Sequence, residues 1–309
     1  MGRTAETNRT SEHEASSRHV TRRATVPALE AVLGRAFPVL DHGFVRVVDY
    51  LGDDAAIVQA ARVSYGRGTK SVSNDRGLIR YLLRHAHTTP FEMCEIKFHV
   101  KLPIFVARQW VRHRTASVNE MSGRYSILDR EFYSPQPAVL GVQDASARQG
   151  RGKALPGPQA RRILSILKRD ATTAYAHYGE FLGPRGTEQP LARELARIGL
   201  PVSFYTQWYW KIDLHNLLHF IALRLTGHAQ FEIRAYAQAM AAIVKRWVPL
   251  AWEAFDDYRM SAVRLSRVEA GVVRALLRGG DARALAAQLS ARERDELAAA
   301  LGIDLNRLA

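Results

Sequence analysis

The fold of this chain is decided by residues 94–114, which read CEIKFHVKLPIFVARQWVRHR. In the first nine residues apolar and polar side chains alternate, a period of two that predicts a β-strand with one buried face. From Pro103 to Val111 the pattern is typical of a short helix with proline in its first turn. The helix runs out at Arg112-His113-Arg114, so these three polar side chains are expected together beside a buried strand.

A dense polar run continues from this tripeptide to residue 125 and reads RHRTASVNEMSGRY. Arginine presents a planar fork of N–H donors that pairs with phosphate through two hydrogen bonds, so two arginines beside a histidine predict a site for a phosphorylated ligand. Ser122, Gly123 and Arg124 add a hydroxyl, a backbone free to approach closely and another cation, which suits a nucleotide phosphate. The alternative is a solvated basic turn, the usual role of an isolated Arg-His-Arg tripeptide.

The order Arg112-His113-Arg114, seven further residues and Ser122 resembles the RHR-x7-S signature of the flavin-dependent thymidylate synthases. The flanking sequences PIFVARQW at residues 103–110 and SGRYS at residues 122–126 also resemble that family. The resemblance extends over roughly residues 40 to 262.

This resemblance implies an α+β fold, with a mainly antiparallel sheet and long helices. It also implies the reductive methylation of dUMP to dTMP, with 5,10-methylenetetrahydrofolate as carbon donor, NADPH as reductant and bound FAD as cofactor. Members of the family assemble as homotetramers whose active sites draw residues from several chains. The partners expected are therefore dUMP, folate, NADPH and further copies of the chain, with no membrane and no nucleic acid.

The resemblance also assigns site residues. For the flavin it implies Ser64, His87, Thr89, Glu92, Arg112, His113, Arg114, Glu120, Asp213, His215 and His219. For the pyrimidine nucleotide it implies Gln109, Arg112, Glu120, Met121, Ser122, Gly123, Arg124, Arg197 and Arg224. Arg224 resembles the arginine that favours ionisation of the uracil ring, and a permanently charged guanidinium can stabilise such a developing anion.

Cys94 is a candidate nucleophile, because the other, unrelated class of thymidylate synthase attacks uracil with a cysteine. Here the thiol belongs to the apolar face of the predicted strand. A thiol among apolar side chains has a raised pKa and is a poor nucleophile. The sequence therefore predicts methyl transfer without an enzyme cysteine.

His215 and His219 are four residues apart, on one face of a predicted helix, a spacing that also suits a pair of metal ligands. A zinc hydrolase would need a glutamate in the position that Asn216 occupies. No metal is therefore expected, and the resemblance places both histidines beside the flavin.

The composition limits the alternatives. The chain has 309 residues, a formal net charge of +14 and a sequence pI near 10.2, which favours anionic partners such as nucleotides, folate polyglutamate or nucleic acid. A basic nucleic-acid-binding module remains an alternative, although no zinc finger, RNA-recognition signature or basic heptad array is present. A second alternative is a flavoprotein of the same fold that lacks methyl transfer.

A cytoplasmic location is expected from the cysteine content and the absence of targeting signals. The single cysteine rules out an intramolecular disulfide. No apolar run approaches 18 residues, and the first 25 residues contain no apolar core of a secretory signal.

Three regions are predicted along the chain. Residues 1–35 show little periodicity and predict a mobile N-terminal arm. Residues 36–262 form the flavin-dependent thymidylate synthase domain, and residues 263–309 form a C-terminal helical extension that Gly279-Gly280 divides. Within the domain, residues 140–160 are predicted to be a surface loop. Helices are predicted at residues 55–63, 74–85, 159–181, 190–197, 213–226 and 230–255, and strands at 44–51, 94–102 and 202–210.

Overall fold

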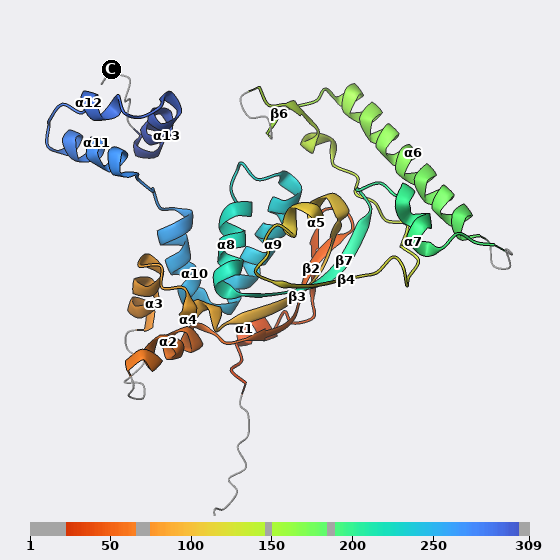
Figure 1. Ribbon diagram of the computed structural model, residues 1–309, viewed down its shortest axis with the longest axis horizontal. Helices are drawn as coiled ribbons and strands as arrows, with labels where there is room; N and C mark the ends of the chain where they lie inside the picture. Colours follow the sequence, from red (N-terminus) through yellow and green to blue (C-terminus); the bar gives the residue numbers. More distant parts are fainter. Residues whose placement is uncertain (1–22, 66–74, 146–149, 184–188, 303–309) are drawn as a thin grey trace, which may run out of the picture.

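The computed structural model describes residues 23–65, 75–145, 150–183 and 189–302 (Figure 1). Its centre is a five-stranded sheet in the order β1-β2-β3-β7-β4, in which every neighbouring pair is antiparallel. The strands are β1 Ala36–Val39, β2 Gly43–Leu51, β3 Glu95–Pro103, β4 Ser117–Glu120 and β7 Tyr205–Asp213. Helices surround this sheet, so the predicted α+β class with a mainly antiparallel sheet is confirmed.

Strand β3 is the central strand, and its period-two pattern decides which face of the sheet is buried. Ile96, Phe98, Val100 and Leu102 are all completely buried, whereas the residues between them are partly exposed. Opposite β3, strand β7 contributes Trp208 and Trp210 to the same core. This apolar face is the surface against which the helices pack.

The helices of the described residues range from single turns to seven turns. Their bounds are α1 Pro27–Glu30, α2 Asp54–Arg62, α3 Asp75–Arg84, α4 Thr89–Glu92, α5 Ile104–Trp110, α6 Gly157–Leu182, α7 Arg193–Ala196, α8 Leu214–Arg224, α9 Phe231–Trp247, α10 Pro249–Phe255, α11 Arg267–Leu277, α12 Arg283–Ala286 and α13 Ala291–Leu301. A π-helix, Asp256–Met260, continues α10. None of these helices is long and apolar enough to cross a membrane.

Trp110, at the end of α5, joins the sheet to the helices. Its indole ring contacts Trp208 and Trp210 of β7, Phe220 of α8 and Tyr236 of α9, with ring centroids between 4.7 and 5.8 Å apart. Trp110 is completely buried. Trp110, two residues before Arg112, is thus held rigidly against β7, α8 and α9.

Several predicted boundaries need correction. Residues 140–160 are not an irregular loop, because β5 Gly141–Gln143 pairs with β6 Arg151–Ala154 before α6 begins. The helix predicted at 230–255 breaks at Val248, since Pro249 has no N–H to continue the ladder and starts α10 instead. The helix predicted at 190–197 is limited to α7 followed by a 3₁₀ turn at Arg197–Gly199.

The predicted mobile arm is wrong for residues 23–35, while residues 1–22 lie outside the described part of the chain. Leu29 of α1 is completely buried and Val32 nearly so, both in the main core. Arg23 forms an ion pair with Asp49 of β2 at 2.8 Å. This segment is therefore part of the packed structure.

Helices α11, α12 and α13 pack around an apolar cluster of their own, which contains Val272, Ala282, Ala286, Leu289 and Leu297. In Figure 1 they lie beyond α10, on the opposite side of the sheet from α6. Ser266 and Ser290 begin α11 and α13 with capping boxes. The division of the chain near residue 262 stays a prediction, and residues 303–309 lie outside the described residues.

Gly43 is required by a close approach between the sheet and α9. A Cβ atom there would lie 2.1 Å from Tyr236 Oη and 2.6 Å from the carbonyl oxygen of Val39. The same Tyr236 hydroxyl donates a hydrogen bond to the carbonyl oxygen of Lys101 at 2.7 Å, so it cannot move without losing a buried partner.

We therefore expect Gly43→Ala to lower the free energy of unfolding by about 2 kcal/mol through overpacking. Gly179→Ala is the matched control, because a Cβ atom at Gly179 of α6 meets nothing within 4 Å. That change should stabilise the helix by about 0.5 kcal/mol. Denaturant unfolding of the two variants measures both effects, and equal stabilities would contradict the packing argument.

Candidate active site

The decisive polar contact joins the Arg-His-Arg tripeptide to α8. Arg224 Nε donates a hydrogen bond to His113 Nε2 at 3.0 Å, although the two residues are 111 positions apart. His113 also packs edge-on against Phe220, with ring centroids 4.8 Å apart, and lies 6.2 Å from the His219 ring. The expected flavin residue His113 and the expected catalytic residue Arg224 therefore form one unit.

This contact requires a neutral His113, because Nε2 must accept the hydrogen bond. Burial, together with the charges of Arg224 and His219, lowers the pKa of His113 to about 4. Burial also lowers the pKa of the Arg224 guanidinium, which nevertheless remains charged. Since Nε of Arg224 is used by His113, its terminal nitrogens remain available to a ligand.

A cavity of about 260 Å³ lies next to this pair and is lined by His87, His215 and His219. The structure thus brings together three of the expected flavin residues from α8 and from the segment after α3. Their surroundings also include two arginines that the sequence interpretation did not select, Arg259 and Arg264.

His87 is positioned by the way in which α3 ends. Ala86 has a left-handed backbone with φ of 57°, and the N–H of His87 bonds to the carbonyl oxygen of Leu82 at 2.9 Å. This is a Schellman motif with alanine at the position that usually holds glycine. It turns the chain sharply, so that His87 and Thr89 face a large open hollow of about 1580 Å³ that Ser64 also lines.

The predicted nucleotide residues form a second group at the far end of β4. A Cβ atom at Gly123 would lie 3.2 Å from Arg197 Cδ, so a larger residue there would require the arginine side chain to shift by a few tenths of an ångström. Ser122 Oγ accepts a hydrogen bond from the backbone N–H of Arg124 at 3.2 Å, and the Arg124 guanidinium pairs with Glu194 at 3.1 Å. Residues 122–124 and 197 are therefore neighbours.

Glu120 and Met121 belong to the same end of β4. Glu120 accepts a hydrogen bond from the hydroxyl of the buried Thr206 at 2.6 Å. The backbone N–H of Met121 bonds to the carbonyl oxygen of Gln207. Gln109 lies elsewhere, at the end of α5, and donates to the side chain of Gln230. Gln109 and Arg224 thus lie at the ends of α5 and α8, whereas Glu120, Met121 and residues 122–124 follow one another at the end of β4.

Four further expected residues have different surroundings. Arg112 and Arg114 are exposed, and no described residue forms a side-chain hydrogen bond or ion pair with either guanidinium. Asp213 caps α8 and accepts hydrogen bonds from the backbone and side-chain nitrogens of Asn216, each at 2.8 Å. The acceptor atoms of Asp213 are therefore already used within the chain. Glu92 is exposed at the end of α4.

Cys94 is completely buried. Burial, reinforced by the nearby charges of Asp53 and Asp54, raises the pKa of its thiol to about 12. It lies just before β3, and its backbone carbonyl accepts a hydrogen bond from Leu214. A thiol with this pKa is protonated at neutral pH and is not a nucleophile.

Comparison with known proteins identifies the family. A family model described as thymidylate synthase complementing protein matches residues 46–250. A flavin-dependent thymidylate synthase of Ruegeria pomeroyi is 60% identical over 282 residues, which cover 91% of this chain and 93% of the relative. Another, from Gluconobacter oxydans, is 58% identical over 301 residues, covering 97% of this chain and 99% of the relative.

The chain belongs to the flavin-dependent thymidylate synthase family. Among solved structures, the UMP/dUMP methylase PolB from Streptomyces cacaoi, bound with 5-Br UMP, is 33% identical. It superposes with a TM-score of 0.64 over 72% of this chain and 96% of the PolB chain. The complex of PolB with 5-Br dUMP superposes with a TM-score of 0.63. The expected family and fold are therefore confirmed.

The site residues fit the flavin that this thymidylate synthase family uses. FAD combines a pyrophosphate, which needs cations, with a planar ring, which needs an apolar wall and hydrogen-bonding groups. The guanidinium groups of Arg112 and Arg114 are not engaged by described residues. The large hollow beside Thr89 has room for a bulky ligand. The individual assignments to the flavin remain predictions.

All residues expected from the sequence lie within the range of the thymidylate synthase family model, whereas Arg259 and Arg264 lie beyond it. Arg259 falls inside the predicted domain of residues 36–262 and Arg264 just beyond it, and neither belongs to the motifs that carry the family resemblance. A usable signal was present, since residues 258–268 contain three arginines and no acidic residue. That signal does not say which arginines face the site.

The neutral state of His113 has a consequence for stability. Its pKa is lower in the folded chain than in the unfolded chain, so the unfolded chain takes up a proton first as the pH falls. The contribution of the neutral imidazole is complete above a pH of about 6.5 and is lost towards a pH of about 4.

We expect the unfolding free energy to fall by about 1 kcal/mol over this range because of His113, allowing for its partial exposure. His113→Gln keeps an acceptor for Arg224 but cannot be protonated, so its unfolding free energy should depend less on pH. Denaturant unfolding at about pH 7.5 and about pH 5 measures the difference. His177→Gln, at an exposed position of α6, is the control. An unchanged pH dependence in His113→Gln would show that the histidine is not responsible.

Proposed function

We propose that this chain is a flavin-dependent thymidylate synthase that methylates dUMP to dTMP, with 5,10-methylenetetrahydrofolate as carbon donor and NADPH as reductant. Membership of the family over residues 46–250 supports the activity. The observation that carries the mechanism is the hydrogen bond between Arg224 and His113. It orients a permanent positive charge next to the residues expected at the flavin.

Arg224 is the proposed catalytic residue. Its guanidinium can stabilise negative charge that develops on the uracil ring, which makes the ring carbon a better nucleophile. His113 is a positioning residue in this respect, because it accepts from Arg224 Nε and limits the directions in which the terminal nitrogens can point. The apolar ring of Phe220 beside His113 excludes water from the same region.

The second group of residues is proposed to bind the nucleotide. The guanidinium groups of Arg124 and Arg197 and the hydroxyl of Ser122 are suited to the phosphate. Glu120 is held by Thr206, so it can present its second oxygen in a fixed direction to an N–H or hydroxyl donor of the nucleotide. Gly123 allows this backbone and Arg197 to come close together.

Bound FAD would supply the hydride chemistry that no amino-acid side chain can perform. The residues proposed to hold it are Ser64, His87, Thr89, Glu92, Arg112, His113, Arg114, Glu120, Asp213, His215 and His219. Both carboxylate oxygens of Asp213 already accept hydrogen bonds from Asn216, so Asp213 would contact the flavin while it still caps α8. Cys94 takes no part, because its thiol is buried and protonated.

We also propose that a homotetramer completes the active sites. Arg224 and His113 form one group of the chain, the Arg224 group, and Ser122, Gly123, Arg124 and Arg197 form another, the Ser122 group. No hydrogen bond or ion pair of the described residues joins the two groups. Apolar side chains around the Ser122 group are exposed: Tyr125 by 79%, Leu195 by 49% and Ile198 by 74%. A second copy that covers them would also bring its own Arg224 group towards these residues.

The remaining partners are proposed to be small anions, in line with the charge of +14, and the compartment to be the cytoplasm. The alternative of a flavoprotein without methyl transfer makes the same prediction for bound flavin. It differs only in the fate of dUMP, so the test must follow the hydrogen at uracil C5.

Arg224→Ala should reduce the release of tritium from C5 of labelled dUMP by about 100-fold or more, because the stabilising charge is lost. Flavin absorbance of the purified variant should remain, since Arg224 is not proposed to bind the flavin. Arg246→Ala, on the exposed end of α9, is the matched control. Wild-type protein that binds flavin but releases no tritium would favour the alternative flavoprotein, and full activity in Arg224→Ala would remove the proposed role.

Ile198→Asp should convert the assembly to smaller species, because a carboxylate cannot be buried without a partner. Light scattering measures the mass of the assembly. Leu277→Asp changes a residue of α11 that is 82% exposed and should leave the mass unchanged. A tetramer that persists in Ile198→Asp would show that this surface is not the interface.

A further inference from the structure

The cavity of about 260 Å³ beside His87 carries more positive charge than the predicted site residues explain. Its walls are formed by the segment after α3, by α8, and by the end of the domain at Arg259 and Arg264. Leu218 and Phe255 supply apolar surface. No aspartate or glutamate is among the described residues that line it.

The two arginines are close enough to repel each other. The pKa of Arg259 is lowered first by burial and then by the charge of Arg264. The pKa of His219 is lowered by burial and by the charges of His215 and Arg259. Neither arginine has an ion-pair partner within the described part of the chain. Like charges gathered at a cavity without a counter-charge are stabilised by a bound anion.

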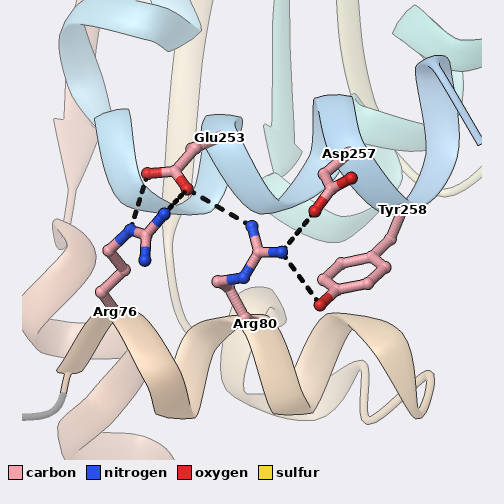
Figure 2. A network of polar contacts seen from close by, with 5 residues as sticks. All are labelled: Arg76, Arg80, Glu253, Asp257 and Tyr258. Atoms are coloured by element: carbon pink, nitrogen blue, oxygen red, sulfur yellow. Dashed lines mark hydrogen bonds and ion pairs between the residues drawn. The ribbon is translucent and has the colours of Figure 1, made fainter.

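A network of ion pairs joins α3 to α10 and to the π-helix that contains Arg259. Arg76 and Arg80 of α3 both bind Glu253 of α10, and Arg80 also binds Asp257 and, at 3.1 Å, the hydroxyl of Tyr258 (Figure 2). The guanidinium of Arg80 lies 4.8 Å from the Tyr258 ring centre. Helix α3 leads directly into the cavity wall at His87, so the network fixes two walls of the cavity relative to each other.

The π-helix decides which side chains reach the cavity. The N–H of Ser261 bonds to the carbonyl oxygen of Asp256 at 2.8 Å, five residues earlier, which widens the turn. Asp257 and Tyr258 are directed towards α3 (Figure 2), whereas Phe255 and Arg259 line the cavity. Wide turns of this kind occur frequently at functional sites.

The size of the cavity limits the ligand. A volume of about 260 Å³ is below the range of about 300–1,000 Å³ that holds an entire drug-sized ligand. It can take one end group of a larger molecule that extends past His87 into the part of the open hollow left free by the flavin, since His87 lines both spaces.

We propose that Arg259 and Arg264 form an oxyanion subsite that binds the terminal phosphate or carboxylate of one of the enzyme's organic substrates. Two sources carry this chemistry: the phosphate that distinguishes NADPH from NADH, and the glutamate carboxylates of the folate. The proposal rests on the proposed function for these substrates. Arg259 and Arg264 lie beyond residues 46–250, which the family model matches.

The test measures binding without turnover. Calorimetry on the flavin-loaded enzyme compares NADP⁺ with NAD⁺, and polyglutamylated with monoglutamylated tetrahydrofolate. Arg259→Gln and Arg264→Gln should each weaken the more highly charged member of one pair by about tenfold and change the less charged member much less. Loss with NADP⁺ identifies a phosphate subsite, and loss with the polyglutamate identifies a carboxylate subsite; either result supports the proposal.

Two controls keep the result interpretable. Arg278→Gln, in the exposed turn after α11, should bind all four ligands as the wild type does. Arg264→Lys retains a positive charge and should recover part of the lost affinity, which a merely misfolded variant would not. Affinities of both glutamine variants within about twofold of wild type for every ligand would overturn the proposal. Tritium release by the wild-type enzyme tests the proposed function separately.

Discussion

The burial of Trp110 is the constraint on which the rest of the site depends. Its ring contacts both tryptophans of β7 and aromatic residues of α8 and α9, so the end of α5 cannot shift relative to any of them. The indole N–H has no partner among the described residues, a cost of about 1–3 kcal/mol that the packing of the ring must offset. Because this packing fixes the point at which the chain leaves the core after α5, His113 lies within hydrogen-bonding distance of Arg224.

A second feature of the site is that its cavity is lined by positively charged side chains and by no carboxylate of the described residues. Among the described residues, ion pairs join helices to one another, as at Arg76 and Glu253, and also neighbouring strands, as at Lys211 and Glu95. At the cavity the balance is different, because two arginines and three histidines line it and no aspartate or glutamate of the described residues does. Such an arrangement does not stabilise the empty fold. It lowers the electrostatic cost of binding anionic nucleotides and folates.

The sequence predicted those elements whose pattern is local. The alternation of residues 94–102 gave the right strand and the right buried face, and the helix predicted at residues 55–63 corresponds to α2. The prediction was weaker for segments whose structure depends on packing against distant parts of the chain. Residues 140–160 are polar and rich in glycine, yet they form a paired hairpin, and Leu29 is buried although its surroundings resemble an unstructured arm. Neither outcome is encoded by periodicity, because each depends on a distant surface that completes it.

Residue types and their spacing along the chain determined the family, the α+β class and the choice of arginine and histidine as the ligand-binding groups, because these follow from the chemistry of the side chains and from local periodicity. Only the tertiary structure decided which of them meet. It paired Arg224 with His113 across 111 residues, separated both from the Ser122 group, and brought Arg259 and Arg264 to the wall that contains His87. The physical reason is that these contacts depend on the packing of buried aromatic rings from distant elements and on the directions in which the wider turn of the π-helix points its side chains. Neither is a property of any short segment.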